Sequence, residues 1–127
     1  MLPWLCLAAA CSQSAVNDVN EVLNARNLAT SNRDIAAYSM LIADDYQADG
    51  KTKAEIIAHI KTLFSQFKEL KMESFGRDIF IADANNARAA QSYRLKVRMD
   101  DSWREMLQRE ELSLVRTDSG WKISAGL

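Results

Sequence analysis

The side chains that most often carry acid–base, nucleophilic or metal chemistry are scarce in this chain of 127 residues. His59 is the only histidine, and helical spacing places it about 100° from the centre of the apolar face of its segment, which favours a solvated position. Asp44 and Asp45 are adjacent acids, but neighbouring residues of an extended segment point in opposite directions. The sequence has no glycine-rich phosphate loop, nucleophile elbow or metal-binding motif. We therefore assign no catalytic residue and expect no metal and no cofactor.

Both cysteines, Cys6 and Cys11, lie in an uncharged segment at the start of the chain. The apolar run from Leu2 to Ala10 is shorter than the roughly 20 residues that span a bilayer. The stretch LAAACSQS, residues 7–14, passes from small apolar residues to a cysteine and then to polar chain, as at the end of a secretory signal. It resembles a bacterial lipobox, whose cysteine is lipidated and becomes the mature N-terminus.

We therefore predict a signal over residues 1–11, a lipid anchor on Cys11, and one domain over residues 12–127 on the periplasmic side of a membrane. Ser12 stands where aspartate resembles an inner-membrane retention signal, which favours the outer membrane. Two alternatives remain open, an ordinary cleaved signal and a buried N-terminal segment. Residues 12–127 contain no cysteine, which excludes an internal disulfide, a thiolate metal site and a nucleophilic cysteine in that domain.

The composition of the chain indicates the size of its core and excludes some classes of partner. The 48% of hydrophobic and 26% of charged residues are typical of a globular protein with one core of ordinary size. The net charge of −1 provides no general attraction to nucleic acid or to anionic lipid. We expect no nucleic-acid partner, and contact with a membrane only through the lipid anchor.

The first half of the chain predicts the three helices that would position a site. Apolar residues recur at helical spacing over residues 16–29, with Ser14 as the cap, and again over residues 33–42. Residues 44–50 are expected to form a short strand and a turn. The sequence from Thr52 to Glu55 is a capping box that opens a third helix, whose apolar face runs to Phe67.

Beyond Phe67 the apolar pattern has a period of two, which predicts strands. Gly76 interrupts the first of them with a bend, residues 87–99 alternate between an inner face and a basic outer face, and residues 121–125 form the last strand. A two-residue loop at Asp100 and Asp101 fixes the register of the central hairpin.

In that register Gln91 faces Glu110 on the inner side of the sheet. On the outer side Lys96 faces Glu105, so the pairing places opposite charges together.

Two stretches carry a family resemblance: YSMLIADDYQADGKTKAEIIAHI, residues 38–60, and LSLVRTDSGWKISAG, residues 112–126. They resemble the nuclear transport factor 2-like superfamily, with the SnoaL and ketosteroid isomerase fold, and the resemblance covers about residues 16–127. It implies an α+β fold in which three N-terminal helices pack on a curved antiparallel sheet and enclose a cone-shaped pocket. These motifs are structural, so they predict the fold better than the activity.

Within this fold the pocket lies between the helices and the concave face of the sheet. The residues expected to face it are Tyr38, Tyr46, Gln91, Tyr93, Gln108, Glu110 and Trp121. A few polar groups in a mostly apolar cavity would orient a small apolar ligand. A buried Glu110 would resist ionisation and could act as a proton donor or base, or it could only hydrogen-bond to Gln91 across the sheet.

The favoured function is therefore a small-ligand-binding or protein-interaction module. The alternative is a small isomerase- or hydrolase-type enzyme that uses Glu110 or Asp49 with the tyrosines. Strand alternation places Asp49 opposite to Tyr46, so we expect Asp49 to point outward.

The outer face of the sheet is expected to form a homodimer interface. Trp103, Leu107 and Val115 fall on this face among charged residues, a composition typical of interfaces. The alternative is a solvated face on which Trp103 lies under Arg98 as an exposed cation–π pair.

Overall fold

The computed structural model describes the backbone of residues 3–127 and the side chains of residues 12–127. Within this part, helices precede the long strands, as predicted. The elements are α1 (Pro3–Ser31), α2 (Ile35–Met40), β1 (Gln47–Ala48), β2 (Lys51–Thr52), α3 (Lys53–Gln66), β3 (Leu70–Ile81), β4 (Asn86–Met99), β5 (Ser102–Thr117) and β6 (Gly120–Ala125).

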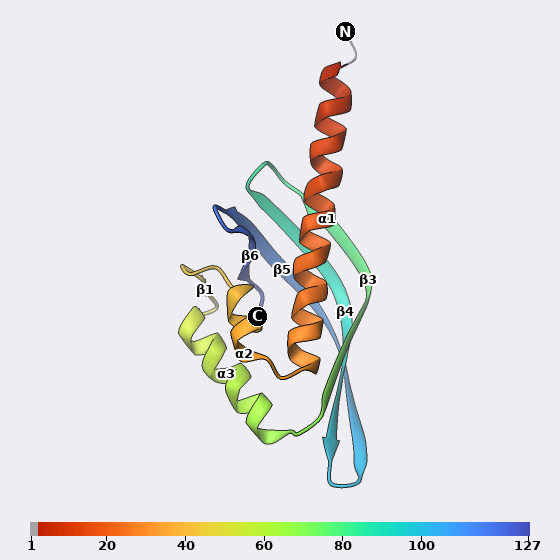
Figure 1. Cartoon of the computed structure of the whole chain (residues 1–127), viewed down its shortest axis with the longest axis vertical. Coiled ribbons are helices and arrows are strands. Elements are labelled where there is room, and N and C mark those ends of the chain that lie inside the picture. The colour runs from red at the N-terminus through yellow and green to blue at the C-terminus, as the bar shows by residue number, and fades with distance from the viewer. Residues whose placement is uncertain (1–2) are drawn as a thin grey trace.

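The long strands form one antiparallel sheet in the order β3-β4-β5-β6, while β1 and β2 form a separate hairpin. In Figure 1 the sheet is strongly twisted, the helices gather along one side of it, and the β4–β5 hairpin extends past them at one end. The prediction of an α+β fold with three helices and a curved antiparallel sheet is confirmed.

The register of the β4–β5 hairpin is the predicted one. Gln91 is opposite Glu110, Lys96 is opposite Glu105, and the loop consists of Asp100 and Asp101. Asp100 adopts a left-handed φ of 55°, which the tight loop requires and which aspartate tolerates better than most residues. The predicted bend also occurs, because the β3–β4 register shifts between Phe75 and Asp78 around Gly76.

Helix α1 begins earlier than predicted. It runs without a break from Pro3 to Ser31, so the assignment of Ser14 as its cap was wrong. The predicted cleavage and lipidation at Cys11 concern a side chain outside the described residues. Among the residues that are described, no helix is both long and apolar enough to cross a membrane.

The two shorter helices begin at capped positions. The side chain of Asp34 accepts a hydrogen bond from the backbone N–H of Ala37 and caps α2, which starts two residues later than predicted. The predicted capping box of α3 is present, with Thr52 and Glu55 each accepting from the backbone N–H of the other. These caps fix where both helices begin.

The core lies between the helices and the inner face of the sheet. Val19 and Leu23 of α1 and Ile123 of β6 are fully buried, and Tyr38 of α2 meets Phe64 of α3 edge to face at 6.4 Å between ring centroids. The β4–β5 hairpin extends past the helices that cover this core (Figure 1).

Candidate functional site

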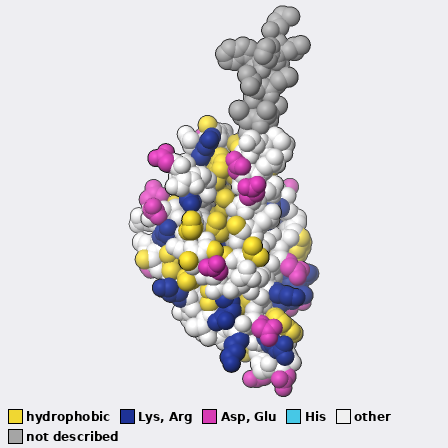
Figure 2. Space-filling model, viewed as in Figure 1, with side chains coloured by type: hydrophobic (Ala, Val, Ile, Leu, Met, Phe, Trp, Pro, Cys, Tyr) yellow, Lys and Arg dark blue, Asp and Glu magenta, His cyan; other side chains and the backbone are white. Residues whose placement is uncertain are grey.

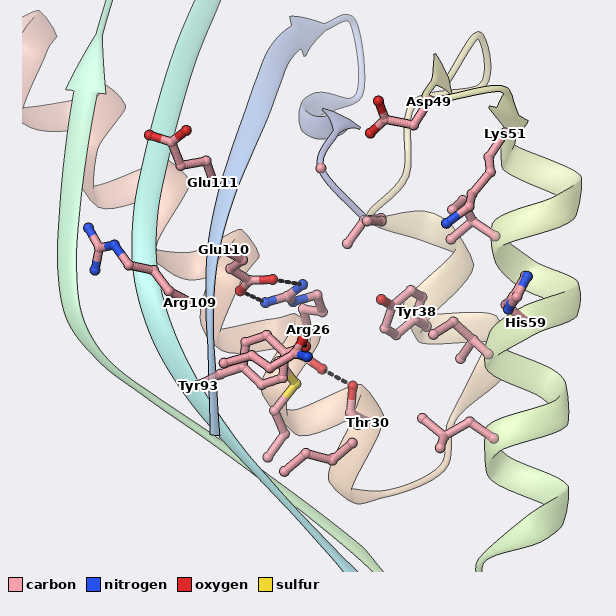
Figure 3. A pocket seen from close by; sticks show the side chains of 18 residues that line it. Arg26, Thr30, Tyr38, Asp49, Lys51, His59, Tyr93, Arg109, Glu110 and Glu111 are labelled. Carbon is pink, nitrogen blue, oxygen red and sulfur yellow. Dashed lines mark hydrogen bonds and ion pairs between the residues drawn. The ribbon is translucent and has the colours of Figure 1, made fainter. Parts of the chain in front are cut away.

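A cavity of about 540 Å³ lies between α1, α2, α3 and the inner face of the sheet. Such a volume is within the range of small-molecule sites. Its apolar lining is formed by Ile56, Ile60, Leu63, Met72 and Leu95, and its polar lining includes Arg26, Thr30, Tyr38, Tyr93, Gln108 and Glu110. Figure 3 shows the polar side chains converging from α1, α2 and the sheet.

The structure brings four of the seven predicted pocket residues to this cavity: Tyr38, Tyr93, Gln108 and Glu110. Gln91 is fully buried and does not line the cavity, but it donates a hydrogen bond to Glu110, which does. Tyr46 and Trp121 are buried core residues that do not line the cavity. The hydroxyl of Tyr46 accepts a hydrogen bond of 3.0 Å from the backbone N–H of Leu127, which does line it.

Glu110 forms a buried ion pair with Arg26, a residue that sequence reasoning did not assign to the site. The two side chains are only 9% and 4% exposed. Nη1 of Arg26 donates to Oε1 of Glu110 at 3.0 Å, and Nη2 donates to Oε2. Gln91 Nε2 also donates to Oε2, at 2.8 Å. Both carboxylate oxygens therefore already accept hydrogen bonds.

The ion pair favours the charged form of Arg26. Burial alone would lower the pKa of Arg26, but the hydrogen bond to Glu110 and the surrounding negative charge outweigh burial, so its pKa lies above the ordinary value. One sequence signal pointed to this residue. Arg26 falls on the same helical stripe as Val19, Leu23 and Thr30, which are all buried.

Two tyrosines flank the ion pair. The Arg26 guanidinium lies 6.0 Å from the centroid of the Tyr93 ring, and Tyr93 donates its hydroxyl proton to Gln108 at 2.9 Å. The hydroxyl of Tyr38 points toward the ion pair (Figure 3). Burial raises the pKa of Tyr38, and the charge of Arg26 opposes this only in part, so the hydroxyl is held in its neutral form.

A polar network behind Glu110 fixes the orientation of Gln91. Arg77, at the bulge of β3, donates from Nε to Gln91 Oε1 at 2.7 Å. Its other nitrogens donate to Asn20, Asn24 and Ser74. Because the amide oxygen of Gln91 is occupied by Arg77, the amide nitrogen is left to donate to Glu110.

The open side of the cavity carries Asp49, Lys51 and His59. All but Lys51 are exposed, so the solvated position expected for His59 is confirmed. Asp49 is exposed, as expected, but it also borders the cavity. Asp49 and Gly50 adopt left-handed φ values of 52° and 74°, and this turn breaks the alternation and brings Asp49 to the cavity.

Among the described residues, no group of three or more histidine, cysteine, aspartate or glutamate side chains is arranged to hold a metal ion. The polar groups of the cavity are hydrogen-bond donors and acceptors around one ion pair, whose two members are hydrogen-bonded to each other. They are suited to orienting a ligand rather than to coordinating a metal.

Comparison with solved structures shows the same fold in proteins of distant sequence. A protein from Kribbella flavida superposes with a TM-score of 0.79 at 14% identity, over 91% of this chain and 89% of that one. A proposed dehydratase of the NTF2-like family from Streptomyces avermitilis gives 0.79 at 13%, over 90% and 94%. A proposed scytalone dehydratase from Novosphingobium aromaticivorans gives 0.81 at 8%, over 93% and 85%.

The sequence itself also matches a family model. No curated protein matches the chain. The model of the SnoaL-like domain matches residues 19–125, which include α2, α3, the six strands and the C-terminal part of α1. The chain therefore belongs to the SnoaL-like domain family, within the nuclear transport factor 2-like superfamily.

Proposed function

We propose that this chain is a binding module that holds a small ligand in the cavity between its helices and its sheet. The observation that carries the proposal is the buried Arg26–Glu110 ion pair beside a cavity of about 540 Å³ that is lined by both apolar and polar side chains. The ligand would place an apolar body against Ile60, Leu63 and Leu95, and a polar end near the hydroxyl of Tyr38. A few fixed polar groups in an apolar site give orientation and specificity.

The same ion pair argues against catalysis by Glu110. Three hydrogen bonds from Arg26 and Gln91 occupy three of the four lone pairs of the Glu110 carboxylate, which leaves only one, on Oε1, for a general base. Breaking a buried ion pair to release the carboxylate would cost about 3–5 kcal/mol. An isomerase- or hydrolase-type enzyme that uses Glu110 with Tyr38 or Tyr93 is therefore the less favoured function. The structural neighbours include two proposed dehydratases, but this ion pair weighs against a catalytic Glu110 here.

The proposal includes the location of the module. Residues 1–11 would direct export, and a lipid on Cys11 would tether the domain to the periplasmic side of a membrane. Support comes from the uncharged apolar start of the sequence and from the small residues before Cys11. This segment precedes the match to the SnoaL-like domain.

A fluorescent probe tests the cavity directly. The dye 1-anilinonaphthalene-8-sulfonate combines an aromatic body with an anionic acceptor, and we expect it to bind the full chain with enhanced fluorescence. Leu63→Trp fills the cavity and should abolish that binding, whereas Leu28→Trp makes a matched change at an exposed site and should preserve it. Equal binding by both variants, or none by the native chain, would overturn the proposal.

Once the probe binds, candidate ligands can be ranked by displacement. Compounds that displace the dye should also raise the melting temperature, because a ligand that binds only the folded state stabilises it. Small aromatic and aliphatic carboxylic acids and ketones form the first set, since each has an apolar body and an acceptor for the Tyr38 hydroxyl.

A further inference from the structure

Lys51 is a half-buried cation of the cavity without an acidic partner among residues 12–127. It lies in β2 and lines the cavity together with Ile56 and Ile60 of α3. Within this part of the chain, no carboxylate lies within ion-pair distance of its ammonium group. Figure 3 shows the Lys51 side chain extending from β2 into the cavity, on the side where Tyr38 lies. The cavity therefore holds a positive charge that these residues do not pair.

Lys53, two residues further along the chain, is a paired lysine in the same part of the fold. Its Nζ lies 2.9 Å from Oδ1 of Asp44. Lys53 is half-buried like Lys51, but it does not line the cavity. The two lysines therefore differ in partner and in position while sharing side-chain type and degree of burial.

The charged residues on the sheet side of the cavity do not neutralise Lys51. Arg26 and Glu110 form an ion pair with each other. Arg109 and Glu111 also border the cavity, but both are exposed, and in Figure 3 their side chains point away from it. Neither pair changes the net charge inside the cavity.

Asp49 is the remaining acid of the cavity border. It is exposed, and its carboxylate lies beyond ion-pair distance of the Lys51 ammonium group. Water and dissolved salt screen an exposed charge more strongly than a half-buried one. The positive potential of Lys51 is therefore preserved on the inner side of the cavity mouth.

We propose that the ligand is an amphipathic carboxylate, whose head group binds between Lys51 and Tyr38 and whose apolar body packs on the apolar lining of the cavity. The ligand would occupy the cavity of the proposed function, on which this inference rests. A carboxylate accepts hydrogen bonds from an ammonium group and from a hydroxyl group, and hydrogen bonds between charged groups are the stronger ones. The ligand would thus supply the negative charge that a half-buried lysine needs.

The size of the cavity favours a free acid over a membrane lipid. Its volume of about 540 Å³ is within the range of sites for drug-sized molecules. The two acyl chains and the head group of a phospholipid exceed this volume. We therefore expect an aliphatic or aromatic acid with a single apolar body.

The surface of the domain does not supply a preference for anions. On the face shown in Figure 2, acidic and basic side chains are interspersed, and the net charge of the chain is −1. The molecule as a whole therefore exerts no general attraction on anions. A preference for a carboxylate over a neutral ligand of the same shape would come from within the cavity.

Two ligands that differ in charge test the assignment. Octanoate and octanamide have the same carbon chain, and at neutral pH only octanoate is charged. Isothermal titration calorimetry measures both dissociation constants on the full chain with Cys6→Ser and Cys11→Ser. We expect octanoate to bind about tenfold more tightly, the factor typical of one hydrogen bond between charged groups.

Lys51→Gln should remove this preference. It should raise the dissociation constant of octanoate about tenfold and leave that of octanamide within about twofold, because only the charge is lost. Unchanged binding of octanamide establishes that the cavity is intact. Lys51→Arg keeps the positive charge and should retain octanoate binding within about threefold of the native value.

Lys53→Gln is the matched control. It changes the net charge by the same amount two residues away, at a lysine that does not line the cavity. We expect both dissociation constants to stay within about twofold of the native values, because salt screens a charge outside the cavity. Vesicles of phosphatidylglycerol, added as a competitor, should leave octanoate binding unchanged.

Four results would overturn the proposal. The first is a native chain that binds octanamide as tightly as octanoate or binds neither, and the second is a Lys51→Gln chain that keeps the preference. The third is an equal loss of octanoate binding in Lys53→Gln, and the fourth is competition by the vesicles, which would make a membrane lipid the ligand. The proposed function is decided separately, because dye binding that Leu63→Trp abolishes would still show a ligand site in the cavity.

Discussion

Arg26 and Glu110 are 84 residues apart in the sequence and meet as a buried ion pair beneath the cavity. The pair joins α1 to β5 at the point where the helix crosses the inner face of the sheet. Both side chains are almost completely buried, so neither can lose the other without leaving a buried charge uncompensated. The same two side chains therefore stabilise the fold and line the cavity.

Arg26→Met is expected to lower the free energy of unfolding by about 3–5 kcal/mol, because it leaves Glu110 charged and buried. Arg26→Met combined with Glu110→Met should lose less than the sum of the two single variants, since no charge is then left unpaired. Urea unfolding monitored by circular dichroism measures all three. An additive result would contradict the coupling of the two residues.

An exposed ion pair provides the control for that prediction. Arg98 and Glu69 lie 3.4 Å apart, and both side chains are about half exposed. Arg98→Met should change the free energy of unfolding by at most about 1 kcal/mol. A loss as large as that of Arg26→Met would show that burial is not the reason for the difference.

Some features of the site could be predicted from the sequence because they depend on neighbouring residues. The two-residue loop at Asp100 and Asp101, with the alternation of its flanking strands, set the register and placed Glu110 on the inner face opposite Gln91. The capping box of α3 likewise needs only Thr52 and Glu55.

Other features depend on contacts between distant segments. Helical period places Arg26 on the buried stripe of α1, but it cannot select a partner on β5. Alternation predicts which face of the sheet or strand Tyr46 and Trp121 lie on, but it does not predict whether they pack in the core or line the cavity. Both are buried in the core and do not line the cavity. Alternation did not place Asp49 at the border of the cavity, because a left-handed turn interrupts the alternation.

The buried hydroxyl of Tyr38 predicts a loss of stability at high pH. Burial raises the pKa of Tyr38 above its ordinary value of 10.0, so the folded state binds this proton more tightly than the unfolded state does. The resulting stability is present below the unfolded pKa and is lost as pH rises from about 10 toward the folded pKa. Tyr38→Phe should therefore show a smaller decrease in the free energy of unfolding between about pH 8 and pH 11.

Tyrosinate absorbance near neutral and alkaline pH provides the direct measurement. We expect the native chain to ionise one more tyrosine above pH 10 than Tyr38→Phe does, and later than the ordinary pKa of 10.0. If Tyr38 ionises at its ordinary pKa without any loss of stability, the hydroxyl is not buried beside the ion pair.

Gln91 is expected to stabilise the fold through its two opposite hydrogen bonds. Gln91→Met removes the acceptor of Arg77 Nε and one donor to Glu110, and should lower the free energy of unfolding by about 1–3 kcal/mol. Gln108→Met makes the same substitution on the same face of the sheet at an exposed position, where only an exposed hydrogen bond from Tyr93 is lost, and should change the free energy of unfolding by less than about 0.5 kcal/mol. Similar losses of unfolding free energy from both variants would show that the buried hydrogen bonds of Gln91 do not stabilise the fold more than an exposed glutamine does.

The proposed lipid anchor predicts a specific mass for the processed protein. Expressed in a bacterial host with residues 1–11 intact, the chain should be cleaved before Cys11 and should carry a diacylglycerol on that cysteine, because the small residues before it and the polar chain after it match a lipobox. Mass spectrometry of the membrane fraction measures both changes. Cys11→Ser should abolish both the cleavage and the lipid, whereas Cys6→Ser should leave them unchanged. An unprocessed native chain in the cytoplasm would refute the anchor, and cleavage without lipid would indicate an ordinary signal.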